Sequence, residues 1–67
     1  MSVNREFYLA RADECAIEAA SARLENVRER ALRSEAAWRE MAERMRRVEA
    51  QRVVAEAARA ERIASEG

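Results

Sequence analysis

Cys15 is the side chain that could most directly support nucleophilic or redox chemistry. A reactive thiolate needs exposure and nearby positive charge. Cys15 instead has Asp13, Glu14 and Glu18 close to it in the sequence and falls on an apolar stripe. We therefore interpret it as a small buried hydrophobe. One Cys cannot form an internal disulfide, which agrees with a reducing compartment and a cytoplasmic location.

Carboxylates are plentiful, but the residues that usually work with them in metal and acid–base sites are missing. The chain has no His and one Cys, whereas zinc sites use several such ligands. Glu40 and Glu43 lie three residues apart, yet carboxylate-bridged iron sites in helical bundles require Glu-x-x-His. The single Gly is Gly67, which excludes a glycine-rich phosphate loop. We expect no catalytic residue, no metal ligand and no cofactor, and therefore no enzyme.

Trp38, Met41 and Met45 could line a small-molecule pocket. Aromatic and Met side chains at helical spacing more often fill the contact between two helices. We interpret these three residues as part of such a contact.

Arg side chains could recognise phosphate, and all thirteen basic residues of the chain are Arg. An Arg-rich helix lying along nucleic acid would use Arg44, Arg46, Arg47 and Arg52. Acidic residues interleave with this segment, no aromatic residue accompanies it, and the net charge of the chain is zero. These features argue against nucleic acid, and nucleic-acid binding is kept as the alternative function.

A simpler role for these charges is to stabilise a helix. Glu precedes Arg by four residues at several positions, which is the favourable order for an ion pair on a helix surface. The pairs are Glu29 with Arg33, Glu35 with Arg39, Glu40 with Arg44, and Glu43 with Arg47.

The composition predicts that all of these residues lie on helices. The chain has no Pro and is dominated by Ala, Glu and Arg, which are strong helix formers. We predict an all-α antiparallel helical hairpin with a helix at about 4–22, a turn at about 23–26 and a long helix at about 26–65. The alternative is one continuous helix that pairs with other copies.

Polar residues mark the expected helix starts. Asn4 is a competent N-cap, and Val3 would then meet Tyr8 in a hydrophobic staple. Asn26 precedes Glu29 by three residues, which resembles a capping box at the start of the second helix.

One apolar stripe on each helix predicts the helix–helix contact. Its members recur at alternating spacings of three and four residues. In the hairpin register Ala12 would lie against Trp38, and Tyr8 would lie near Met41 and Met45. The predicted interface residues are Tyr8, Ala12, Cys15, Ala19, Val27, Ala31, Trp38, Met41, Met45 and Val48.

Further apolar residues lie outside this contact. A thinner stripe repeats every seven residues at Ala10, Ile17 and Leu24, and the second helix matches it with Leu32, Ala36, Ala50, Val54 and Ala57. These residues are either scattered surface positions or an oligomer surface. A chain of 67 residues has a marginal core, so we expect self-association into a dimer or a larger helical bundle or coiled coil.

The chain reads as one small helical domain, residues 1–67. Residues 49–67 would be a frayed or partner-bound helical extension. No apolar run reaches the ~20 residues of a membrane span, and we expect no membrane interaction. A protein partner of unknown identity remains an alternative to self-association.

The segment 7–45 carries the pattern YxxRAxEC…R…AWxxMA, formed by Tyr8, Arg11, Ala12, Glu14, Cys15, Arg28 or Arg30, Ala37, Trp38, Met41 and Ala42. It resembles a class of short uncharacterised two-helix proteins of alpha-proteobacteria. The resemblance implies a hairpin and implies no known activity. The function expected from the residues is a non-enzymatic protein–protein interaction or regulatory module.

Overall fold

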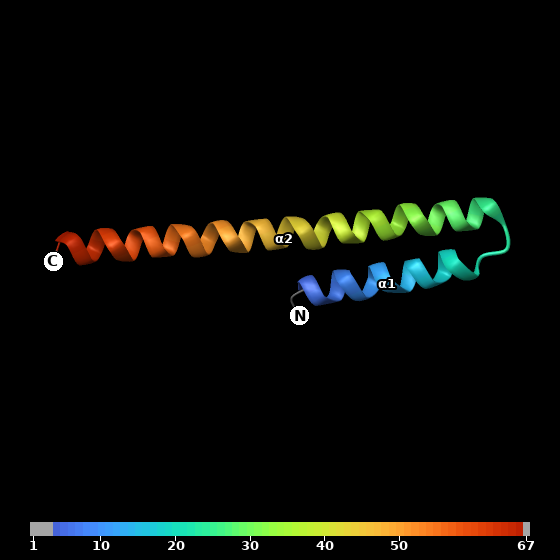
Figure 1. The fold of residues 1–67 in the computed structure, drawn as a ribbon, viewed down its shortest axis with the longest axis horizontal. Coiled ribbons are helices and arrows are strands. Elements are labelled where there is room, and N and C mark those ends of the chain that lie inside the picture. Colours follow the sequence, from blue (N-terminus) through green and yellow to red (C-terminus); the bar gives the residue numbers. More distant parts are fainter. Residues whose placement is uncertain (1–3, 67) are drawn as a thin grey trace.

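The computed structural model describes residues 4–66 and contains two helices in antiparallel arrangement (Figure 1). Helix α1 spans Arg5–Ser21 and helix α2 spans Glu25–Glu66. Residues 22–24 separate them, so the chain forms a hairpin rather than one continuous helix. The predicted all-α hairpin is confirmed.

Helix α1 begins at the predicted cap. The Asn4 Oδ1 atom accepts a hydrogen bond from the Phe7 backbone N–H at 2.9 Å, which satisfies one donor of the first turn. Asn4 itself has an extended backbone, as an N-cap residue should. The expected staple cannot be compared, because Val3 lies outside the described residues.

The turn is shorter than predicted, and the capping role of Asn26 is wrong. Ala22 ends α1 with extended backbone angles, and the Leu24 carbonyl already accepts a hydrogen bond from the Arg28 N–H at 3.1 Å. Leu24 therefore occupies the N-cap position of α2, and Asn26 lies inside the first turn. The described chain reverses without Gly and without a positive φ, so three residues are sufficient.

The core between the two helices is built from small side chains. The buried residues are Ala12, Cys15, Ala19, Ala31 and Ala42. Among the described residues no large side chain is fully buried. Small residues let the two helix axes approach closely, and the larger side chains then cover the sides of the contact.

The molecule is a rod of 65 × 21 × 14 Å. Its radius of gyration is 18.6 Å, whereas a compact domain of this length would have about 11 Å. The cause is the difference in helix length: α1 has 17 residues and α2 has 42, or roughly 26 Å against 63 Å. The far half of α2 projects beyond the hairpin, and no other described segment lies beside it (Figure 1). We call residues 46–66, all of which are exposed, the tail.

Candidate functional site: the helix contact and the exposed tail

An aromatic cluster joins the beginning of α1 to the middle of the hairpin's long helix. The rings of Tyr8 and Trp38 are stacked with centroids 5.8 Å apart. Phe7 meets Trp38 edge to face at 6.0 Å and Tyr8 at 5.9 Å. Such pairs stabilise a contact by about 0.5–1.5 kcal/mol beyond their area burial. The cluster therefore clamps the otherwise free N-terminal end of α1 onto α2.

Arg11 completes this cluster. Its guanidinium carbon lies 5.5 Å from the centroid of the Trp38 ring, within range of a cation–π interaction. The same side chain forms an ion pair with Glu14 one turn along α1. Arg11 thus covers the outer face of the indole while its charge stays in solvent.

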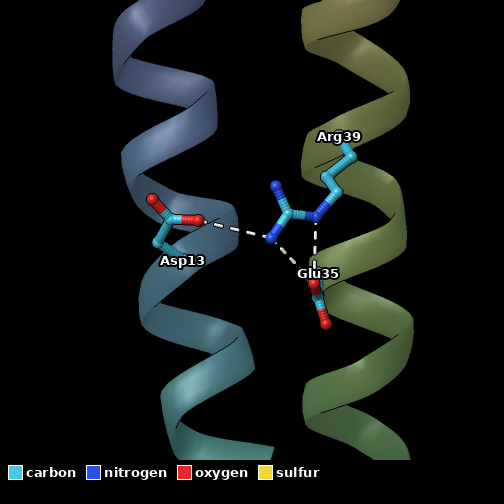
Figure 2. A network of polar contacts seen from close by, with 3 residues as sticks. All are labelled: Asp13, Glu35 and Arg39. Atoms are coloured by element: carbon cyan, nitrogen blue, oxygen red, sulfur yellow. Dashed lines mark hydrogen bonds and ion pairs between the residues drawn. The ribbon is translucent and has the colours of Figure 1, made fainter.

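A polar network crosses between the helices on the neighbouring edge of the contact. Arg39 Nη2 lies 3.3 Å from Asp13 Oδ1 on α1 and 2.8 Å from Glu35 Oε2 on α2, and Figure 2 shows the guanidinium between the two carboxylates. The hydrogen bond to Glu35 is the largest cause of the raised pKa of Arg39, and Asp13 adds to it. This is the interhelical ion pair of the described chain, and because both side chains are largely exposed it adds only a small favourable contribution to the register set by packing.

The hairpin brings most of the sequence-predicted interface residues together. Ala12, Cys15, Ala19 and Ala31 are buried, and Tyr8, Val27, Trp38, Met41 and Met45 are half-buried. Val48 is the exception, with 58% of its surface exposed. Arg5, the first residue of α1, lines one surface groove with Met45 and Ala50, so α1 reaches only to this level of α2.

Sequence reasoning missed three features of the contact. Ala42 is buried, although it lies one residue to the side of the predicted stripe. Phe7 joins the aromatic cluster, although the helical period places it outside the α1 stripe. The pairing of Asp13 with Arg39 could have been found, because these residues directly follow Ala12 and Trp38, which the predicted register placed opposite each other.

Cys15 is a free, buried thiol, as predicted. It lies on the small-residue face of α1 between Ala12 and Ala19, both of which are also buried. Its role in this position is packing.

The four Arg residues of the alternative nucleic-acid site lie on the exposed part of α2, and three of them are paired with Glu on the same helix. Arg46 lies 2.7 Å from Glu43, Arg52 lies 2.7 Å from Glu49, and Arg44 lies 4.0 Å from Glu40. Within residues 4–66 no ion pair is formed by Arg47.

Glu43 takes a different partner from the one predicted. It pairs with Arg46 at i,i+3 rather than with Arg47 at i,i+4, because both oxygens of the carboxylate accept hydrogen bonds from the Arg46 guanidinium. This hydrogen bonding is the main reason that the pKa of Glu43 is lowered, and it also raises the pKa of Arg46. The predicted pairs of Glu35 with Arg39 and Glu40 with Arg44 are confirmed, whereas the described chain shows no pair between Glu29 and Arg33.

The tail exposes apolar side chains that the hairpin does not cover. Val53 is 55% exposed, Val54 is 68% exposed and Ile63 is 63% exposed. Ala50, Val54 and Ala58 also line a surface groove along the helix. Beyond the groove that Arg5 lines with Met45 and Ala50, no other described helix lies beside the tail (Figure 1).

Other kinds of site are not found in the part of the chain that the structure describes. No group of three or more His, Cys, Asp or Glu side chains lies close enough together there to hold a metal ion. Neither helix has a stretch of sufficient length and apolar character to cross a membrane. Comparisons of the chain with protein-family models, with curated proteins and with solved structures found no match.

Proposed function

We propose that this chain is a non-enzymatic helical interaction module that acts as a homo-oligomer, with the hairpin as the folded base and the tail as the associating element. The observation that carries the proposal is the tail, in which Val53, Val54 and Ile63 are exposed to solvent.

The physical argument concerns the stability of a projecting helix. Isolated helices shorter than about 12–15 residues are marginal in water, and most helical stability in proteins comes from packing of an apolar face. The tail has no such packing in one copy of the chain. Association with a second copy supplies it, and the same contact removes the valine side chains from solvent.

Sedimentation velocity over a range from about 1 to about 500 μM chain tests the proposal. We expect the weight-average mass to rise from one chain toward two or more. A single species with the mass of one chain across this range contradicts the proposal. The buried thiol of Cys15 requires a reductant in the buffer, so that an intermolecular disulfide is not counted as association.

Binding of nucleic acid through the α2 arginines is the second candidate function. The observation in its favour is Arg47, which is exposed and forms no ion pair within residues 4–66, next to three further exposed Arg residues. The ion pairs of these neighbours and the zero net charge of the chain weaken the attraction to phosphate. Titration with duplex and single-stranded oligonucleotides at about 50 mM salt decides the question, since phosphate contacts are strongest at low salt.

We also propose a cytoplasmic location, in line with a single buried thiol.

A further inference from the structure

We propose that two copies of the chain pair through their tails in an antiparallel arrangement about a twofold axis that crosses the contact at the level of Ala55. The inference rests on the proposed self-association and adds the contacting face, the direction and the register. The contacting face is a tail stripe made of Ala50, Val53, Ala57, Ala60 and Ala64, with Val54 beside it.

The tail stripe has the geometry of a helix–helix contact. Its members follow one another at spacings of three, four, three and four residues, which places them on one face of α2. All of them are exposed in the single chain. Four of the five are Ala, so two such helices can approach closely, and the valines then fill the space at the sides.

The other face of the tail is less suited to a second copy. It continues the seam against which α1 packs, and after Met45 it carries Glu49, Arg52, Glu56 and Arg59 at the same helical spacing. Burying these charges would cost desolvation energy. The start of α1 also occupies part of this seam, because Arg5 lies beside Met45 and Ala50. A second tail on this seam would meet α1. The tail stripe lies to one side of the seam, and of its five members only Ala50 lines the groove beside Arg5.

Charge complementarity selects the antiparallel register. When Val53 of one copy lies opposite Ala57 of the second copy, Ala50 lies opposite Ala60 and the two Val54 side chains meet near the axis. The same register brings Arg47 beside Glu61 of the second copy, once on each side of the axis. Within residues 4–66 neither Arg47 nor Glu61 is engaged in an ion pair of its own chain.

Other registers of the same stripe have less favourable charge contacts or a shorter overlap. A shift of one heptad toward the hairpin places Glu43 opposite Ala60, and a shift toward the tail end shortens the overlap. A parallel pair would bring Glu56 close to Glu61 of the second copy, which is a repulsive contact on both sides. In the antiparallel register the two copies of Glu56 repel each other and Arg46 lies opposite Ala64, but Arg47 and Glu61 attract each other on both sides of the axis.

A charge-swap series measures this register. Arg47→Glu and Glu61→Arg each replace two attractive contacts by two repulsive ones, so each single variant should raise the dimer Kd about tenfold. The double variant Arg47→Glu with Glu61→Arg restores both attractions in reverse, and its Kd should return to within about threefold of the unmodified chain. Arg62→Glu is the matched control, because it reverses a charge next to Glu61 in sequence on the opposite side of the helix and should leave the Kd nearly unchanged.

The outcomes separate this inference from the proposed function. Self-association that is insensitive to both single swaps, or a double variant as weak as the single ones, overturns the register while the proposed self-association stands. A monomer at every concentration overturns both. Circular dichroism of each variant at a concentration where the unmodified chain is monomeric shows whether a swap has damaged the helix itself.

The direction of the pairing has a separate readout. In a Cys15→Ser background, spin labels are placed singly at Ala55, Gln51 and Arg44, which are all exposed. From the rise of the helix, the antiparallel register predicts an axial offset between equal labels of about zero at Ala55, roughly 12 Å at Gln51 and roughly 33 Å at Arg44. Equal distances at Gln51 and Arg44, which lie one heptad apart on the same side of the helix, would show a parallel pair and overturn the proposal.

Discussion

Trp38 is the residue on which the hairpin contact depends most. It lies against Tyr8, Phe7 and Arg11 at the end of the hairpin opposite the turn. The buried residues of the contact are small, so each of them removes little apolar surface from water. The aromatic cluster therefore supplies a large share of the stabilisation.

Trp38→Ala should lower the free energy of unfolding by roughly 2 kcal/mol, about half of the loss expected for a fully buried Trp. Thermal unfolding followed by circular dichroism measures the change. Trp38→Phe is the matched control, because it keeps an aromatic ring and should lose less. If Trp38→Ala left the melting curve unchanged, the aromatic clamp would not hold the hairpin together.

Glu43 provides a pH-dependent prediction at the same scale. Its pKa is lowered in the folded chain, chiefly by the hydrogen bonds from Arg46, from an ordinary value of 4.5. The carboxylate therefore contributes stability above pH 4.5, and this contribution is lost as the pH falls through the lowered folded-state value. Its size is small because both side chains are in solvent.

The comparison of the unmodified chain with Glu43→Gln isolates this effect from the titration of the other carboxylates. Melting curves recorded between about pH 7 and about pH 3 should show a stability difference at neutral pH that disappears in acid. A difference that persists unchanged at the acidic end would contradict the assignment of the ion pair.

At the scale of the elements, the two helices begin in different ways. Helix α1 has a side-chain cap, because Asn4 Oδ1 accepts the Phe7 N–H. Helix α2 has Leu24 in the N-cap position, which offers no side-chain oxygen, and Asn26 lies within the first turn. The two Asn residues look alike in the sequence, but only one of them caps a helix.

Asn4→Ala should destabilise the chain by about 1 kcal/mol, whereas Asn26→Ala should cost no more than a few tenths of a kcal/mol or be slightly stabilising. Urea unfolding of both variants measures the difference. Equal losses would mean that Asn26 does act as a cap and that α2 begins one residue later.

At the scale of the whole molecule, the long helix extends well past the short one. One copy of the chain leaves the tail with Val53 and Val54 in solvent, so its helical state depends on what covers it. The hairpin and the tail should therefore respond differently to concentration, the hairpin being independent of it.

The mean helical signal per residue should rise with concentration in step with the sedimenting mass. Val53→Asp places a charge on the tail stripe. It should therefore raise the chain concentration at which the helical signal and the sedimenting mass increase by at least tenfold. Ala55→Asp introduces the same charge on the other side of α2 and is the control. It should leave the concentration dependence of the helical signal and of the sedimenting mass nearly unchanged. Equal effects of the two substitutions would indicate that the tail stripe is not the associating face.

The helical class and the hairpin could be predicted from sequence because they depend on local quantities. The composition, which lacks Pro and is rich in Ala, Glu and Arg, predicts helices. The spacing of the apolar residues predicts which face of each helix is turned inward. The burial of Cys15 followed from the same period. The self-association, the absence of enzymatic activity and the resemblance to other two-helix proteins stay predictions.

What the sequence by itself determined is thus the helical period and the inward face, since both depend on neighbours within one turn. Only the tertiary structure decided the choice of Leu24 over Asn26 at the start of α2 and of Arg46 over Arg47 as the partner of Glu43. The same holds for the place of Phe7 beside Trp38 and for the crossing of Arg39 to Asp13. The physical reason is that these alternatives differ by about 1 kcal/mol or less locally, so the approach of the second helix and the rotamers it permits decide between them.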